Sequence, residues 1–149
     1  MPSETEKAWF AGFLDGEGYI QISQYKGWYT LIVRISNLHL PTLLKIKALW
    51  GKGAVKLVPN APTHGPFWRW HVKANQALEI LEDVFPYLVT KRAEAETAIA
   101  FQRNHTSRKR SNQYTPGRAQ ENRNTDKILK EALECIRKST KESTLKGGD

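Results

Sequence analysis

The sequence predicts an α+β domain in which an antiparallel sheet is covered on one face by helices. Two pairs of short segments alternate apolar and polar residues, as half-buried strands do. Each pair is preceded by a segment with the apolar spacing of a helix, and further helical segments follow the second pair. A chain of 149 residues with 40% hydrophobic residues can bury a core for one such domain.

The first helix is predicted to begin after Ser3, which stands three residues before Glu6 in the spacing of a capping box. Residues 8–14 are apolar on nearly all sides, so this helix must be buried in a core or against another subunit. Gly12 lies inside it, where glycine costs about 1 kcal/mol relative to alanine. A glycine there indicates the close approach of another backbone.

Four segments are predicted to be strands. Residues 19–25 and 30–36 alternate and are joined by a Lys-Gly turn, which makes the first hairpin. Residues 54–58 and 67–73 form the second pair, separated by a loop with three prolines. Their outward face is polar, cationic and aromatic, and the residues expected to contact a nucleic-acid groove are Gln21, Ser23, Tyr25, Arg34, Lys56, Arg69, His71 and Lys73. The alternative is a merely solvated face.

The remaining helices are expected over residues 42–50, 75–85, 91–104 and 125–138. The polar and basic residues 105–124 are expected to form a mobile arm that contacts phosphates, and the residues after 138 a disordered tail. The chain is thus divided into a core domain, residues 1–104, and a C-terminal part, residues 105–149, with a basic linker, a helix and a tail.

Composition excludes several classes of protein. No apolar run approaches the roughly 18 residues that cross a bilayer, so no membrane partner is expected. The first ten residues lack the pattern of a secretory signal, and Cys135 is a single cysteine. We therefore expect a protein that is not secreted and that is cytoplasmic, or organellar or nucleoid-associated.

Charge gives the first positive indication of function. Lys and Arg number 23 against 15 Asp and Glu, a net charge of +8, and five Trp and five Tyr are interleaved with the basic residues. A polyanionic partner releases condensed counterions when its phosphates are neutralised. The basic excess and the interleaved aromatic residues favour a nucleic-acid partner over the alternative that the charge serves solubility alone.

The segment from Phe10 to Gly18 reads FAGFLDGEG. It resembles, position by position, the LAGLIDADG motif of the homing endonucleases, with Asp15 and Glu17 on the two acids. The order of the expected elements also resembles the family's αββαββα core, over about residues 4–104. The resemblance therefore implies an αββαββα core, to which the helix expected over residues 125–138 adds a C-terminal helical extension.

The resemblance implies a homodimer, because the chain holds one copy of the motif and single-motif members pair their motif helices at a two-fold axis. Trp9, Gly12 and Phe13 are the residues expected at that interface. Glu17 and the carbonyl of Gly16 would then hold Mg²⁺, which takes one or two carboxylates and otherwise water and phosphate.

Two further catalytic residues are implied by the resemblance. Lys91 matches an active-site lysine at the turn into the last core helix; otherwise it is an ordinary exposed lysine at a helix start. Asn37 falls where members often keep a water-ordering polar residue, although a turn or capping role is equally expected. A further basic residue of the family is missing beyond it, where His39 could substitute. For Asp15 a local structural role is favoured over catalysis.

These observations predict a Mg²⁺-dependent, site-specific endonuclease that hydrolyses double-stranded DNA at a long pseudo-palindromic site. The alternative is a non-cleaving relative, either a maturase that binds intron RNA or a DNA-binding regulator. A dimeric structural domain without a nucleic-acid role is disfavoured by the net charge of +8.

Overall fold

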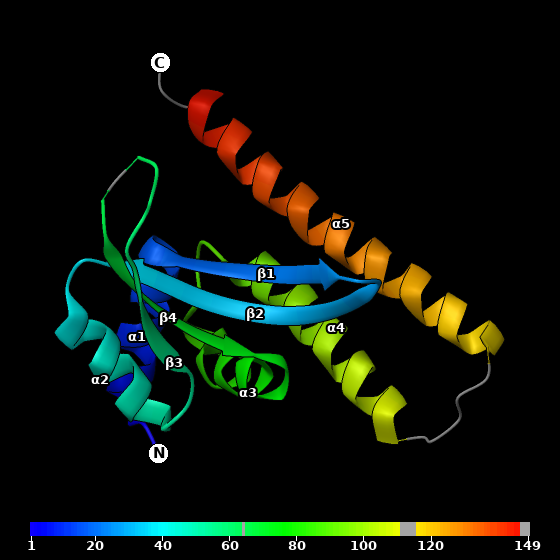
Figure 1. Ribbon diagram of the computed structural model, residues 1–149, viewed down its shortest axis with the longest axis horizontal. Coiled ribbons are helices and arrows are strands. Elements are labelled where there is room, and N and C mark those ends of the chain that lie inside the picture. Colours follow the sequence, from blue (N-terminus) through cyan, green and yellow to red (C-terminus); the bar gives the residue numbers. More distant parts are fainter. Residues whose placement is uncertain (64, 111–115, 147–149) are drawn as a thin grey trace.

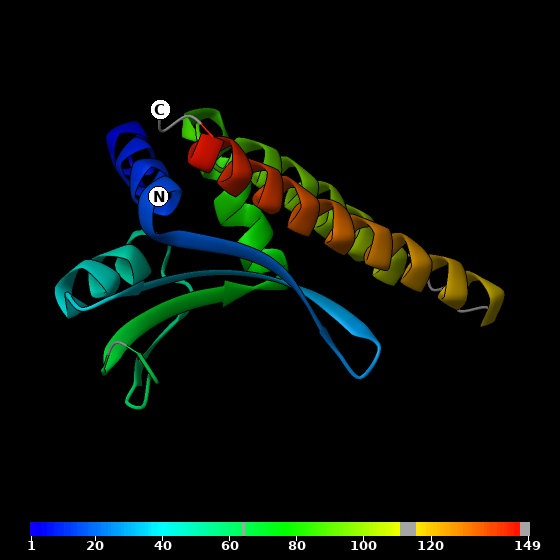
Figure 2. The same cartoon turned by 90° about the horizontal axis from the view of Figure 1, so that it is seen from above.

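The computed structural model describes residues 1–63, 65–110 and 116–146. Its sheet has four antiparallel strands in the order β1-β2-β4-β3, so β1 and β3 are the edges. Helices lie on one side of this sheet, and in the described part of the chain the other side is left open (Figure 2). The α+β class, the antiparallel sheet and the order of the core elements are confirmed.

The elements before the second hairpin follow the expected pattern closely. Helix α1 (Glu4–Glu17) begins with the predicted capping box, in which the Ser3 hydroxyl accepts from the Glu6 N–H and the Glu6 carboxylate accepts from the Ser3 N–H. Strands β1 (Gly18–Tyr25) and β2 (Trp28–Asn37) meet at Lys26-Gly27, both with positive φ, the backbone that a tight hairpin turn requires. Helix α2 is Leu40–Trp50.

The rest of the core continues in the same order (Figure 1). Strands β3 (Ala54–Val58) and β4 (Phe67–Lys73) have the predicted bounds. Helix α3 (Ala74–Val84) leads through the short 3₁₀ turn η1 (Phe85–Tyr87) to α4 (Arg92–Arg110) and α5 (Pro116–Lys146). None of these helices, over the residues described, is long and apolar enough to cross a membrane.

The core lies between the sheet and the helices. Its largest fully buried side chains come from the motif helix, the inward strand positions and the helices above them: Phe10, Leu14, Ile20, Ile22, Leu31, Ile35, Leu43, Ile46, Trp70, Ile80, Leu81 and Phe101. Phe10 packs edge-on against the rings of Trp50 and Trp70, at centroid distances of 4.8 and 5.7 Å. These contacts fix the motif helix across one end of the sheet.

The C-terminal third departs from the sequence prediction. The expected mobile arm and linker are wrong for the described residues, because 105–110 continue α4 and 116–124 form the first turns of α5. The helix expected over 125–138 likewise extends to residue 146, so the tail is helical that far. Residues 111–115 of the arm and 147–149 of the tail lie outside the described residues.

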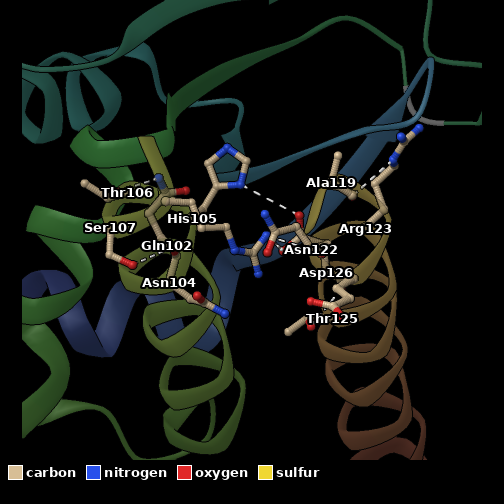
Figure 3. A network of polar contacts seen from close by, with 12 residues as sticks. Gln102, Asn104, His105, Thr106, Ser107, Ala119, Asn122, Arg123, Thr125 and Asp126 are labelled. Atoms are coloured by element: carbon tan, nitrogen blue, oxygen red, sulfur yellow. Dashed lines mark hydrogen bonds and ion pairs between the residues drawn. The ribbon is translucent and has the colours of Figure 1, made fainter. Parts of the chain in front are cut away.

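Polar contacts between α4 and α5 explain this difference (Figure 3). Asp126 is 4% exposed and forms an ion pair with Arg108 at 2.9 Å, and Arg108 also donates to the Asn122 carbonyl. The His105 ring lies 3.8 Å from the same carboxylate. A buried ion pair between helices leaves no hydrophobic periodicity in the sequence, so pattern analysis could not detect it.

Apolar residues of α5 contact the core. Leu133 is fully buried, and Leu129 packs against the same cluster. In both views α5 runs beside α4 and over β1 (Figures 1 and 2). The separation of residues 1–104 as a domain of their own stays a prediction.

Candidate functional site

The functional site is built at the C-terminal end of α1, where the chain passes directly into β1. A Cβ on Gly18 would lie 2.2 Å from Leu14 Cδ1 and 2.6 Å from the Leu14 carbonyl oxygen, so only glycine permits this sharp exit. The exit leaves Gly16 and Glu17 exposed at the helix end. Among the described residues the Glu17 carboxylate makes no hydrogen bond or ion pair.

Asp15 fastens this helix end to the segment that precedes α4. Its Oδ2 accepts from the Val89 N–H and its Oδ1 from the Lys91 N–H, each at 2.8 Å. Both oxygens of the carboxylate are thus engaged by backbone groups more than 70 residues away. These contacts give Asp15 a structural role, but they are long-range contacts rather than the local ones that the sequence led us to expect.

Lys91 returns to the same helix end. Its Nζ donates to the Asp15 carbonyl oxygen at 2.6 Å, and the side chain is half-buried. The carbonyl end of a helix carries partial negative charge and attracts a cation, so this position is favourable. The Lys91 ammonium group is thereby bonded to the carbonyl of the residue two positions before Glu17. Lys91 is therefore not the free surface lysine of the alternative interpretation.

Asn37 and His39 lie at the same end of the sheet but are engaged in a turn. Gly18 pairs with Ile35, so Asn37 lies beyond this pair, alongside the end of α1. The Asn37 Oδ1 accepts from the His39 N–H at 2.8 Å, and the His39 Nδ1 lies 2.7 Å from the Thr42 hydroxyl. Both side chains support the start of α2, while a water-ordering role for Asn37 stays a prediction.

Replacing Asp15 by asparagine should destabilise the fold while leaving the basic side chains of the surface unchanged. The amide keeps one acceptor but loses the charge that strengthens two backbone hydrogen bonds, at a cost of about 2 kcal/mol in the free energy of unfolding. Chemical denaturation of the purified variant measures this. The matched change of the half-buried Asp83, which accepts one bond from Trp50, should cost about half as much. An unchanged stability for the Asp15 variant would contradict the fastening role.

The eight residues expected on the outward sheet face do share one face. The register pairs Gln21 with Ile32, Arg34 with His71, and Lys56 with Arg69, while Ile20, Val33 and Trp70 point into the core. Tyr19 and Trp28 lie on the same face and were not among the eight predicted residues. Trp28 is 67% exposed and pairs with Tyr25 at the hairpin end. Extending the predicted strand 30–36 back by two residues would have placed Trp28 on this face.

This face gathers positive charge that is not neutralised. In the described part of the chain, Arg34, Lys56, Arg69, His71 and Lys73 make no ion pair. Burial, followed by the neighbouring Arg69, lowers the pKa of Arg34. Burial, followed by Lys73, Lys56 and Arg69, lowers the pKa of His71. Like charges placed together without counter-charges form a surface that fits a polyanion.

The outer side of α1 is an apolar stripe. Trp9 and Phe13 stack at a centroid distance of 5.7 Å, and the Lys45 ammonium lies 4.9 Å above the Trp9 ring. A Cβ on Gly12 would meet nothing within 4 Å in this chain. Trp9, Gly12 and Phe13 are thus neighbours on one face of the helix, with room for close approach of another backbone at the glycine.

The donors at the end of α1 fit a divalent ion that takes few protein ligands. The described residues hold no group of three or more His, Cys, Asp and Glu side chains able to bind a metal ion together. One carboxylate and one exposed peptide carbonyl, from Glu17 and Gly16, are hard oxygen donors of the kind that Mg²⁺ uses alongside water and phosphate.

No protein-family model matches the sequence, and no curated protein matches it. Solved structures do resemble the fold. The homing endonuclease I-CvuI in complex with the I-CreI target has a TM-score of 0.70 at 20% identity, over 89% of this chain and 82% of that one. The archaeal intron-encoded homing endonuclease I-Vdi141I complexed with DNA has a TM-score of 0.59 at 15% identity, over 70% of both chains.

A second complex of I-CvuI, with its own target and Ca, covers 93% of this chain and 94% of that one, with a TM-score of 0.60 and 22% identity. The similarity therefore extends beyond the motif helix to nearly the whole chain. The protein has the fold of the LAGLIDADG homing endonucleases.

Proposed function

We propose that the protein is a site-specific endonuclease for double-stranded DNA that acts as a homodimer. The observation that carries the proposal is the exposed Glu17 carboxylate at the end of α1, with the Lys91 ammonium bonded to the same helix end. It lies beside a sheet face whose cations have no counter-charges among the described residues. The solved structures of the same fold that hold DNA targets support this proposal.

A dimer follows from the number of motifs and from the exposed stripe on α1. One chain supplies one Glu17, and cutting two strands requires a second. Packing α1 of one copy against α1 of the other through Trp9, Gly12 and Phe13 would bury the stripe and bring the two Glu17 residues to one axis. A two-fold dimer reads a pseudo-palindromic duplex, since each copy contacts one half-site.

The chemistry at the end of α1 is phosphodiester hydrolysis. Glu17 and the Gly16 carbonyl would hold Mg²⁺, which when bound polarises the phosphate and stabilises the attacking and leaving oxygens. Lys91 is placed to stabilise the negative charge that develops on the scissile phosphate. Asn37 would orient the attacking water through its amide NH₂ group, because its contact with His39 uses only the Oδ1 atom.

The sheet face divides into two kinds of contact. Arg34 and Arg69 can present planar guanidinium groups to guanine edges, while Lys56 and Lys73 act as point charges toward phosphates. Base contacts set the sequence preference, whereas phosphate contacts set register and affinity.

The proposal is tested by incubating the full chain with randomised duplex DNA and MgCl₂ and sequencing the cut ends. We expect one enriched, pseudo-palindromic site and no cutting when EDTA replaces the metal salt. If no site is enriched while a structured intron RNA binds tightly, the protein is a maturase and the endonuclease proposal is wrong.

Duplex binding should strengthen as the pH falls. Burial and the cations Lys73, Lys56 and Arg69 hold the pKa of His71 below its ordinary value, and bound phosphates favour the protonated ring and raise that pKa. A ligand that raises a pKa binds more tightly once the pH drops toward the pKa of the complex. Affinity should therefore rise a few-fold between about pH 7.5 and about pH 5.5.

The measurement is a fluorescence-anisotropy titration at constant ionic strength. His71→Gln should flatten the pH dependence, whereas His39→Gln, which changes a histidine engaged with Thr42, should leave it unchanged. A pH dependence that survives in His71→Gln would exclude His71 as its source.

A further inference from the structure

Arg137, from the long helix α5, is joined to the first residues of β1. It donates from one terminal nitrogen to the Tyr19 hydroxyl at 2.9 Å and from the other to the Ile20 carbonyl. Its guanidinium lies 4.1 Å from the centroid of the Tyr19 ring. The second terminal nitrogen is also 3.7 Å from the carboxylate of Glu94 on α4, which is almost fully buried.

The path of α5 explains how this contact arises. β1 is an edge strand, so part of its backbone has no neighbouring strand to bond. Leu133 anchors α5 in the core one turn earlier, and α5 runs over β1 (Figure 1). Arg137 then satisfies the Ile20 carbonyl at that edge and extends to Tyr19, whose position in the strand belongs to the open face.

The Tyr19 ring is shared with a second arginine. Arg34, directly opposite Tyr19 in the β1–β2 register, places its guanidinium 4.5 Å from the same ring centroid. Among the described residues the side chain of Arg34 makes no hydrogen bond or ion pair. Within that part of the chain the Tyr19 ring is the one contact partner of the Arg34 guanidinium, and the charges of Arg69 and Arg137 both repel it.

We propose that Arg137 is a positioning residue for Arg34, acting through Tyr19, so that α5 helps to set which base the open sheet face prefers. The inference rests on the proposed function, in which Arg34 reads a base. Arg137 fixes the Tyr19 side chain by bonding to the tyrosine hydroxyl and by stacking on the ring. The fixed ring in turn orients the guanidinium of Arg34 and leaves all N–H groups of that guanidinium free for DNA.

The variants must separate positioning from stability, because removing Arg137 alone would leave the buried Glu94 carboxylate without its counter-charge. Arg137→Lys keeps the charge but loses the planar fork. Arg137→Gln in a Glu94→Gln background removes both charges, and Glu94→Gln alone is its reference. Lys138→Gln, on the exposed neighbouring position of α5, controls for the loss of one positive charge.

The first readout is binding of each variant to the selected duplex and to all its single-base changes. Arg34→Ala identifies the base pair that Arg34 reads. At that pair, Arg137→Lys and the double variant should lose about threefold to tenfold of the discrimination, the range expected for losing a cation–π contact. The other positions and the affinity for a scrambled duplex should stay unchanged, as should the whole profile of Lys138→Gln.

The second readout needs no DNA. In the free protein the Nε–H resonance of Arg34 should carry a ring-current shift from Tyr19, lost in Tyr19→Leu and reduced in both Arg137 variants. An unchanged Arg34 resonance in folded Arg137 variants overturns the inference, as does a loss of affinity that is equal at every base pair. If Arg34→Ala changes the base preference and the Arg137 variants do not, the inference fails alone. If the wild-type chain prefers no duplex sequence over another, this result contradicts both the proposed function and the inference.

Discussion

Glu17→Gln is expected to bind the duplex as tightly as the wild type and to lose cleavage. The carboxylate makes no hydrogen bond or ion pair among the described residues, so the amide breaks no contact that the fold uses. It removes the charge that would hold Mg²⁺. Changing a group that only supports a metal ligand costs about 10- to 100-fold in activity, so loss of the ligand itself should cost more than about a hundredfold.

The measurement compares single-turnover cleavage with binding in CaCl₂, each against the matched variant Glu96→Gln. Glu96 is an exposed glutamate on α4, and its amide should leave both properties unchanged. Cleavage by Glu17→Gln at the wild-type rate would remove Glu17 from the mechanism. A parallel loss of binding and cleavage would instead assign it to DNA contact.

Gly12→Leu should have opposite effects on the single chain and on the dimer. A Cβ at Gly12 meets nothing within 4 Å, and leucine favours a helix by nearly 1 kcal/mol over glycine, so the fold itself should become slightly more stable. At a two-fold axis the same side chain enters the interface from both copies. Overpacking of that kind costs about 1–3 kcal/mol per side chain, which weakens dimerisation at least about tenfold.

Sedimentation equilibrium measures the dimer and thermal unfolding at low concentration measures the single chain. Gln76→Leu, at an exposed position of α3, controls for added hydrophobic surface and should dimerise normally. Double-strand cutting should fall with the dimer in Gly12→Leu. If the dimer persists unchanged, the interface lies away from α1.

The sheet and its two faces were predictable from the sequence because strand alternation is local. Ile20 and Ile22 alternate with Gln21 and Ser23, and the period of two decides which side chain enters the core without reference to any other segment. The capping box at Ser3 and the Lys-Gly turn are local as well. The motif residues from Gly16 to Gly18 were identified as candidates because nine consecutive residues resemble the LAGLIDADG motif.

The assembly of the site was decided by contacts between distant segments. Asp15 bonds to the backbone of a residue 76 positions away, which is what brings Lys91 to the end of α1, and no pattern around either residue encodes that distance. Helix propensity alone is too weak to predict that residues 105–110 and 116–124 are helical. Their helices are joined by the buried pair of Arg108 and Asp126, two polar residues that an amphipathic pattern does not mark.

The sequence by itself therefore determined the fold class, the strand faces and the position of the candidate carboxylate, since each depends on residues within a few positions of one another. Only the tertiary structure decided the bonding of Lys91, the length of the last two helices and the contact of Arg137 with Tyr19, 118 residues earlier in the chain. The physical reason is that hydrogen bonds and ion pairs depend on where the folded backbone places two groups. Burial periodicity records only which side of its own element each residue occupies.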